Sequence, residues 1–316
     1  MRINKILVPV DFSPPSTLAV NHGIALARKL RAKLSLLHVV ESPTALLYAF
    51  PTEAEKVERQ RREQAEKMIP ILVNPEDQDD LDVRFLVKTG EVEEIIEQAV
   101  HEEEADAVVM GTHGRTLFGR LLIGSVTQAL LRKLGLPVLT VCRVSRPLEF
   151  KRILFGTDLG PGSDKAFQFA LELAREANAA LVVAHTIDKR PMMTYETPEV
   201  KAVFDEEHRR AVEEVRNRFA EFEAQGTRQK VSIECVLAEG DAAESLVRIA
   251  DETVVDFMIL ALRKKSAVAR TLLGSTAEPV IRTAHVPVLS VPVDDVPAVR
   301  AEPVCSTDPM SLSLSS

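Results

Sequence analysis

The chain has 316 residues, enough for two domains of ordinary size, and its 46% hydrophobic and 27% charged residues are typical of a globular protein. A formal net charge of −8 argues against a general nucleic-acid binder and against a protein that binds anionic membranes. Three widely separated cysteines exclude a disulfide scaffold, and no stretch approaches the ~20 apolar residues that cross a bilayer, so we expect a cytoplasmic protein with reduced thiols.

The first half alternates short aliphatic runs with amphipathic segments. The run at 5–10 predicts a strand buried on both faces, and Ser13 or Ser16 can cap a helix that continues to about Leu30. Further strands are expected at 34–40, 83–87, 107–110 and 138–141, with helices at 53–72, 91–100 and 125–133. Strands separated by helices imply a parallel, doubly wound sheet with right-handed crossovers.

The pattern then repeats. KILVPVDFSPPS from Lys5 returns as RILFGTDLGPGS from Arg152, and the segment from Gly90 aligns with that from Gly240. We therefore expect an α/β protein with two Rossmann-like domains, each a five-stranded parallel sheet flanked by helices, at residues 1–143 and 150–293. RVSRPLEF is interpreted as the linker. Residues 294–316, rich in Ser and Pro and without periodicity, are expected to be a disordered tail.

Two segments of the first copy are candidates for a ligand site, because ligands of open α/β sheets bind beyond the carboxyl ends of the strands. Asp11 follows the first strand, where its carboxylate would either accept hydrogen bonds from a ribose or base, or cap the next helix. MGTHGRTLFGRLLIGSVTQAL, from Met110, joins the fourth strand to a helix. Gly124 and Ser125 place N–H groups at the start of that helix, which favours a phosphate; a loop glycine and a helix cap are the structural alternatives. A P-loop is excluded because no Lys follows Gly124.

The spacing Gly111-x2-Gly114-x9-Gly124-Ser125 resembles the ATP-binding signature of the universal stress protein family. KILVPVDFSPPS, LLHVV and LGLPVLTV resemble the same family in the same order, so the chain looks like a tandem two-domain member over residues 4–293. The resemblance implies that ATP, with Mg²⁺ or Mn²⁺, is bound by the first domain. The implied adenosine contacts are Pro9, Val10, Asp11, Val39 and Met110, and the implied ribose and phosphate contacts are the backbone of Gly111, Gly114, Gly124, Ser125 and Val126. His113 and Arg115 either approach the phosphates or lie on a solvated loop face.

The second copy departs from this signature, since Ala261 and Lys264 replace the first two glycines while Asp158, Gly274 and Ser275 remain. We therefore expect one ATP per chain. The basic residues Lys264, Lys265 and Arg270 would either attract an anion or form a solvated loop. The histidines His38 and His185 occupy equivalent strand positions and are interpreted as core residues.

The favoured function is an ATP-binding regulatory or sensor protein of the stress response. The alternatives are a slow ATPase or nucleotidyl- or phosphotransferase, and a structural dimerisation protein. Binding is favoured over turnover because no nucleophile–base pair, metal-ligand spacing or water-positioning residue is recognisable. The expected partners are the other half of the chain, through 138–141 and 288–291, a second copy, and an unknown protein; nucleic acid and membrane are not expected.

Overall fold

The computed structural model describes residues 2–42, 50–112, 123–142, 148–160, 162–187, 197–264 and 273–294. The first half contains β1 (Lys5–Val10), α1 (Pro14–Leu30), β2 (Lys33–Val40), α3 (Pro51–Met68), the 3₁₀ helix η1 (Ile69–Leu72), α4 (Pro75–Asp80), β3 (Val83–Thr89), α5 (Val92–Glu102), β4 (Ala107–Gly111), α6 (Ser125–Lys133) and β5 (Val138–Val141). The second half contains β6 (Arg152–Gly156), α7 (Ser163–Ala177), β7 (Ala180–Ile187), α8 (Pro198–Gln229), β8 (Ile233–Glu239), α9 (Ala242–Glu252), β9 (Phe257–Lys264), α10 (Ala277–Thr283) and β10 (Val288–Asp294).

The helix expected at 53–72 is the element that differs most from the prediction. α3 ends at Met68 and η1 follows, with Pro70 at its second position. A proline inside an α-helix removes a backbone donor and clashes with the preceding turn, so the α-helical geometry cannot continue through Pro70. The short α4, with Pro75 at its first position, was not expected from the sequence.

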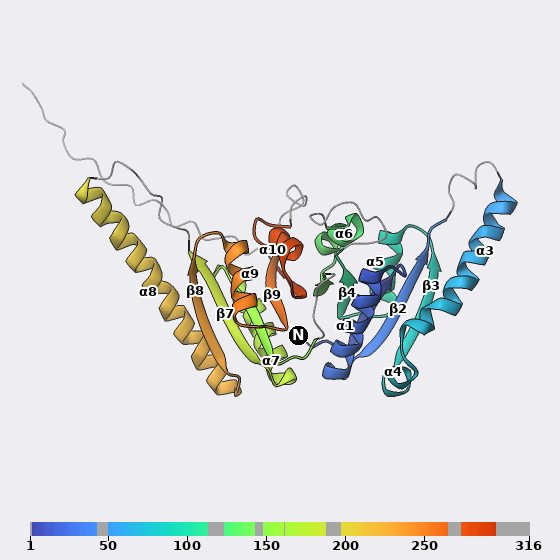
Figure 1. Ribbon diagram of the computed structural model, residues 1–316, viewed down its shortest axis with the longest axis horizontal. Helices are drawn as coiled ribbons and strands as arrows, with labels where there is room; N and C mark the ends of the chain where they lie inside the picture. Colours follow the sequence, from blue (N-terminus) through green and yellow to red (C-terminus); the bar gives the residue numbers. More distant parts are fainter. Residues whose placement is uncertain are drawn as a thin grey trace, which may run out of the picture.

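The strands of each half form a parallel sheet, as predicted, and the structure shows that their order is 3-2-1-4-5 (Figure 1). The second half repeats this order as β8-β7-β6-β9-β10. Because the chain moves outward from β1 to β3 and then returns to β4 on the other side, the strand order reverses between β1 and β4. The carboxyl ends of these two strands therefore flank the switch point at which such sheets bind ligands.

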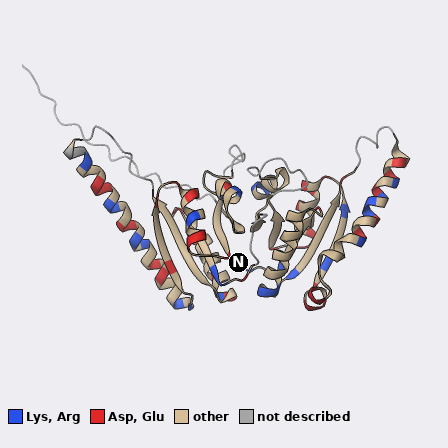
Figure 2. Cartoon of the chain, in the orientation of Figure 1, with Lys and Arg blue, Asp and Glu red and all other residues tan. Residues whose placement is uncertain are grey.

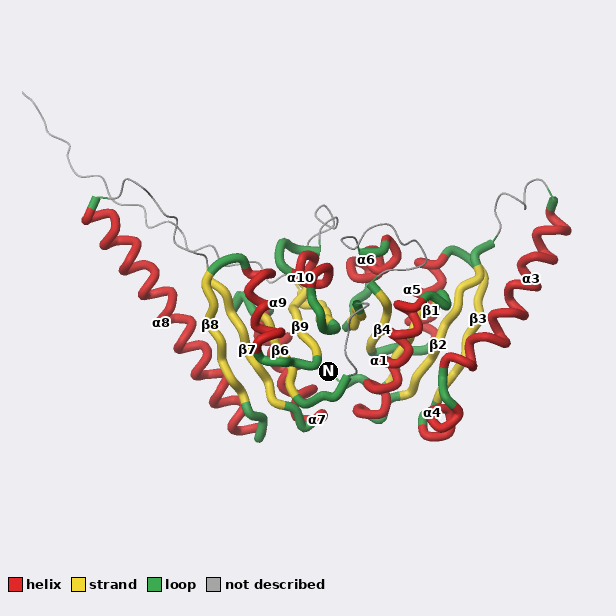
Figure 3. The backbone as a smooth tube through the Cα atoms, viewed as in Figure 1, coloured by secondary structure: helices red, strands yellow, loops and turns green. Residues whose placement is uncertain are grey.

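The two halves meet through their closing strands, as the sequence predicts. β5 and β10 are antiparallel, with Leu139 opposite Leu289 and Thr140 opposite Val288, and the Thr140 hydroxyl donates to the carbonyl of Val288 at 3.0 Å. The two five-stranded sheets are therefore joined edge to edge as one sheet of ten strands (Figure 3). This pairing removes the two edges that the closing strands would otherwise expose.

Two layers of buried side chains cover the sheet, and each continues from one half into the other. One layer lies under α1, η1, α7 and α8 and includes Leu139 and Leu289 at the junction. The other lies under α5, α6, α9 and α10 and includes Val138 and Val288. The chain therefore has two continuous cores, one on each face of the sheet, rather than one core per half.

The end of the predicted linker belongs to one of these cores. Leu148 and Phe150 are buried, and the Phe150 ring meets the Phe257 ring edge-on at 5.7 Å between centroids. Lys29 of the first half lies over the same ring, with its Nζ 5.9 Å from the centroid. Residues 143–147 and the predicted tail from 295 onward lie outside the described residues, as does Cys305.

The outer edges of the ten-stranded sheet lie beside long charged helices. α3 runs alongside β3 and α8 alongside β8, and both helices carry acidic and basic side chains along their length (Figure 2). Charged cover of this kind protects edge strands from pairing with other chains. None of the described helices combines the length and the apolar character that crossing a membrane would need.

Candidate functional site

The corner between β1 and α1 is organised by the Asp11 carboxylate. Asp11 Oδ1 accepts hydrogen bonds from the backbone N–H of Ser13 at 3.0 Å and from its hydroxyl at 2.5 Å. The Ser13 hydroxyl oxygen in turn accepts a hydrogen bond from the backbone N–H of Ser16 at 3.4 Å, and Ser13 is the N-cap residue of α1. The sequence left open whether Asp11 caps this helix. In the structure Ser13 is the cap, and Asp11 orients it.

His38 holds the strand end that precedes Asp11. Its Nδ1 lies 2.8 Å from the carbonyl oxygen of Val10, and the residue is 9% exposed, so it is a core histidine as interpreted from the sequence. The His38 ring also lies 4.5 Å from the ring of Phe12, which adopts a left-handed backbone conformation with φ 61°. The neighbouring strand therefore fixes both the residue before Asp11 and the residue after it.

The end of β4 is tied to the start of α6. The Thr127 hydroxyl donates to the carbonyl of Gly111 at 2.9 Å, and the carbonyl of Thr112 accepts the N–H of Gly124 at 2.8 Å. Thr112 also donates its own N–H to Val141 at 3.0 Å. These contacts hold residues 112 and 123–124 beside each other. The intervening His113, Gly114 and Arg115 lie outside the described residues.

Two glycines of the signature have structural roles that the sequence analysis did not anticipate. A Cβ at Gly111 would lie 2.9 Å from the Pro15 Cβ and 3.1 Å from its carbonyl, so glycine is required here by the close approach of α1. The N–H of Gly124, expected to face a phosphate, is already bonded to Thr112. The N–H groups that helix geometry leaves without intrahelical partners are those of Ser125, Val126 and Thr127.

The described members of the predicted site come from three adjacent strands and one helix. Pro9 and Val10 end β1 and Asp11 follows it, Val39 lies near the end of β2, Met110 and Gly111 end β4, and Ser125 and Val126 begin α6 after the N-cap Gly124. Val10 and Met110 are each 5% exposed, so their side chains belong to the cores. Ser125 is exposed, and Asp11 and Val126 are partly exposed. The fold thus brings these residues to the carboxyl edge at the switch point.

Thr112 and Thr127 were not singled out from the sequence. Their hydroxyl and backbone groups tie β4 to α6, but nothing in the spacing of two threonines on either side of a loop signals this contact. Only the folded arrangement of strand and helix reveals it. The sequence signal that comes nearest is Gly124-Ser125, which marks the start of the helix correctly.

The corresponding corner of the second half is arranged differently. Asp158 Oδ1 accepts the N–H of Gly160 at 2.9 Å, and Asp158 Oδ2 forms an ion pair with Arg263 from β9. α10 begins at Ala277, two positions later than the helix at the aligned serine of the first half, and Gly274 adopts φ 106°. Lys265 and Arg270 lie outside the described residues.

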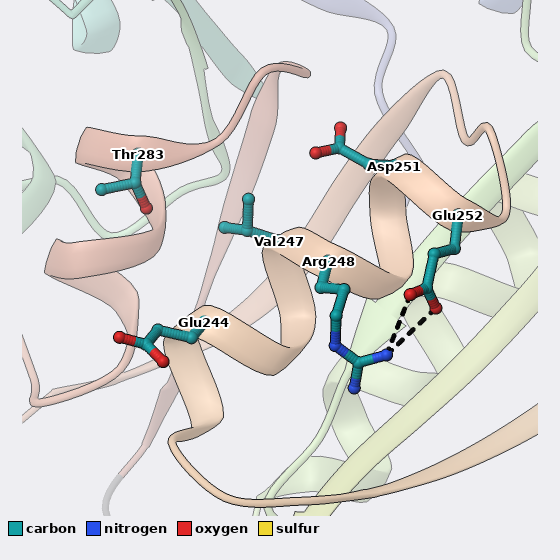
Figure 4. A pocket seen from close by; sticks show the side chains of 6 residues that line it. All are labelled: Glu244, Val247, Arg248, Asp251, Glu252 and Thr283. Atoms are coloured by element: carbon teal, nitrogen blue, oxygen red, sulfur yellow. Dashed lines mark hydrogen bonds and ion pairs between the residues drawn. The ribbon is translucent and has the colours of Figure 1, made fainter.

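A pocket on the molecular surface lies between α9 and α10, away from the residues predicted for the site (Figure 4). Its lining residues are Glu244, Val247, Arg248, Asp251, Glu252 and Thr283. Arg248 is paired with Glu252 at 3.0 Å, and Asp251 with His285 at 3.1 Å. In the part of the chain that the structure describes, no group of three or more His, Cys, Asp or Glu residues is arranged to hold a metal ion.

Comparison with known proteins gives the same two-part division. The model of the universal stress protein family matches residues 2–141 and again 149–292. A universal stress protein of Methanocaldococcus jannaschii, MJ0577, is 31% identical over 153 residues, which are 44% of this chain and 94% of that protein. A putative universal stress protein of Staphylococcus aureus strain USA300 is 27% identical over 155 residues, 49% of this chain and 93% of that protein.

Solved structures share the whole two-half arrangement. A universal stress protein from Archaeoglobus fulgidus superimposes with a TM-score of 0.66 at 19% identity, covering 92% of this chain and 98% of that one. A putative universal stress protein from Pseudomonas aeruginosa UCBPP-PA14 gives a TM-score of 0.59 at 18% identity, covering 92% and 94%. At these identities the likeness concerns the fold.

Proposed function

The chain belongs to the universal stress protein family, and we propose that it is an ATP-binding regulatory or sensor protein whose first half holds the nucleotide. The observation that carries the proposal is the meeting of Asp11 and the start of α6 at one switch point. Asp11 offers carboxylate oxygens to a ribose or base. The first turn of α6 offers N–H groups and a partial positive charge to phosphates.

The roles of the individual residues follow from their positions. The ends of β1, β2 and β4, with Pro9, Val10, Val39 and Met110, would border the adenosine. The backbone of Ser125 and Val126 would bind phosphate oxygens, with the Ser125 hydroxyl as a further donor. The nearby Gly111 contributes indirectly, since it lets β4 end close to α1. Gly114 completes the family signature in sequence, and its neighbours His113 and Arg115 remain part of the proposal as loop residues that would approach the phosphates.

We assign no protein ligand to Mg²⁺ or Mn²⁺, because the described carboxylates form no cluster suited to a cation. A cation that accompanies ATP would then be held by the phosphates themselves. We also propose no chemical step at this site. Regulation by occupancy, in a cytoplasmic protein with a protein partner that reads the bound state, is the function that the arrangement supports.

The direct test is to denature freshly purified protein and identify the released nucleotide by chromatography. We expect ATP or ADP at no more than one molecule per chain. Calorimetry on nucleotide-free protein then gives the stoichiometry, which we expect to be one. Two equivalent sites, or turnover near the ~10 s⁻¹ of ordinary enzymes, would contradict the proposal.

A matched pair of variants locates the site. Asp11→Ala should lower ATP affinity at least tenfold, whereas Asp158→Ala, the equivalent change in the second half, should leave it unchanged. Both residues follow a strand and accept a backbone N–H two residues on, so the two changes perturb comparable corners. Equal losses in both variants would show that the substitution acts through folding rather than through the site.

A further inference from the structure

The second half keeps the backbone arrangement that positions the carboxylate of Asp158, the residue aligned with Asp11. His185 Nδ1 lies 2.8 Å from the carbonyl oxygen of Thr157. In the first half, His38 Nδ1 lies at the same distance from the carbonyl oxygen of Val10. Leu159 adopts the same left-handed conformation as the aligned residue, with φ 55°. The N–H of Gly160 donates to Asp158. The strand end, the turn and the carboxylate are therefore all present, although the signature glycines are lost.

The Asp158 carboxylate forms an ion pair with Arg263. The guanidinium forms an ion pair with Asp158 Oδ2 and also lies over Gly160, where a Cβ would collide with it. Arg263 comes from β9, and Asp158 follows β6, the neighbouring strand. The side chain thus spans the switch point of the second half from one strand end to the other.

A longer strand carries the arginine to this position. β9 remains paired with β10 as far as Lys264 opposite Asp294, whereas β4 ends at Gly111, opposite Val141. The chain of the second half therefore continues along the sheet where that of the first half turns toward its loop. Arg263 lies on this additional stretch, beyond the last residue that the two fourth strands share.

We propose that the Arg263 side chain occupies the position beside Asp158 that a ribose would need, and so excludes a nucleoside from the switch point of the second half. A guanidinium–carboxylate pair is charge-assisted and specific in geometry, so a ribose hydroxyl would have to displace it before reaching Asp158. The excluded site is thus closed by a side chain and not only by the loss of loop glycines. The ligand class in this inference rests on the proposed function of the first half.

The test uses adenosine, which has no phosphate and therefore needs none of the phosphate contacts of the glycine loop that the second half lacks. Equilibrium dialysis should show one adenosine per chain for the wild type and two for Arg263→Ala. Arg248→Ala is the matched control, since it removes another ion-paired arginine of the second half, and it should stay at one. Circular dichroism and the thermal midpoint establish that each variant is folded.

The outcomes separate this inference from the proposed function. If the wild type binds no adenosine and Arg263→Ala binds one, the first-half proposal fails and the role of Arg263 stands. If folded Arg263→Ala binds no more than the wild type, the inference is overturned, whatever the wild type binds. If Arg263→Ala does not fold, Arg263→Gln replaces it in the test, because glutamine keeps most of the side-chain length without the charge. The number of adenosine molecules bound per chain is then compared with that of the wild type.

Discussion

At the scale of single residues, Val254 adopts a backbone conformation that its side chain disfavours. It has φ 50° at the turn between α9 and β9, and it is 62% exposed, so packing gives little in return. The left-handed region costs an L-residue about 1–2 kcal/mol, and a β-branched residue is especially uncommon there. The aligned residue of the first half, Glu104, has φ 51°, so the turn itself belongs to the fold.

Val254→Asn should therefore raise the free energy of unfolding by about 1 kcal/mol, because asparagine tolerates this conformation. Urea denaturation measures the gain as a higher midpoint with an unchanged slope. Val203→Asn is the control, since Val203 is 58% exposed but lies in α8, and it should bring no gain. An unchanged midpoint for Val254→Asn would mean that the turn stores no strain.

Cys235 is a half-buried thiol whose reactivity the structure limits. Burial, with the nearby Glu223 carboxylate, raises the pKa of Cys235 from 9.0 to about 12. The thiolate is the reactive form, so its fraction near pH 8 falls by about a thousandfold. In the variant Cys142→Ser/Cys305→Ser, iodoacetamide should label Cys235 very slowly in the native state and rapidly in urea. Rapid labelling of the native protein would show that Cys235 is not shielded.

At the scale of elements, the same Gly-Ser dipeptide behaves differently in the two halves. Ser125 is the first residue of α6, as the sequence predicts, but the aligned Ser275 precedes α10 by two residues. Gly274 has φ 106°, whereas Gly124 has φ −57°. Sequence alone aligned the two dipeptides. It could not show that their backbones differ, because an identical dipeptide carries no signal for the tertiary structure around it.

The N-cap of α1 gives a prediction that separates stability from binding. Ser13 caps α1 and is also held by Asp11, so Ser13→Ala should cost about 1 kcal/mol of stability and also weaken ATP binding. Asp241→Ala removes the N-cap of α9, which accepts the N–H of Glu244 at 2.9 Å, far from the proposed site. It should cost a similar free energy and leave binding unchanged. Equal ATP affinity of the two variants would show that the Ser13 cap stabilises α1 but does not contribute to ATP binding.

The repeated aspartates Asp106 and Asp256 show what a repeat in sequence can mean. Asp106 Oδ2 accepts the N–H groups of Asn4 and Lys5 at 2.8 and 3.0 Å, and Asp256 bonds the start of β6 in the same way. Both copies keep this carboxylate because it fixes where the first strand begins. A residue repeated in both halves is thus as readily explained by the fold as by a ligand.

At the scale of the whole molecule, alternation and duplication predicted two wound halves, and the otherwise exposed edges of the closing strands, with the family resemblance, predicted that the halves join there. Long buried strands and periodic helices carry strong sequence signals. The contact of Arg263 with Asp158 carried none, because it depends on three additional residues of β9 pairing with β10. The ties between Thr112, Gly124 and Thr127 were likewise missed, since hydrogen bonds across a loop depend on tertiary geometry.

The two continuous cores imply that the halves unfold together. Ile259 of β9 is completely buried in the layer that also contains Val8 of β1, and this layer crosses the junction between β5 and β10. If opening either half exposes the shared core, the most protected amides of both halves exchange only through global unfolding. Shortening a buried side chain in one half must then lower the hydrogen-exchange protection of backbone amides in the other half.

Ile259→Ala should lower the free energy of unfolding by about 2–5 kcal/mol, because it removes buried methyl groups and leaves a cavity. Hydrogen exchange followed by mass spectrometry should show the same loss of protection in β1 and β2 as in β6 and β7. Ile71→Ala is the control, since Ile71 is 78% exposed in η1, and it should change neither half. Protection lost from β6 and β7 alone would mean that the antiparallel junction joins two independently stable domains.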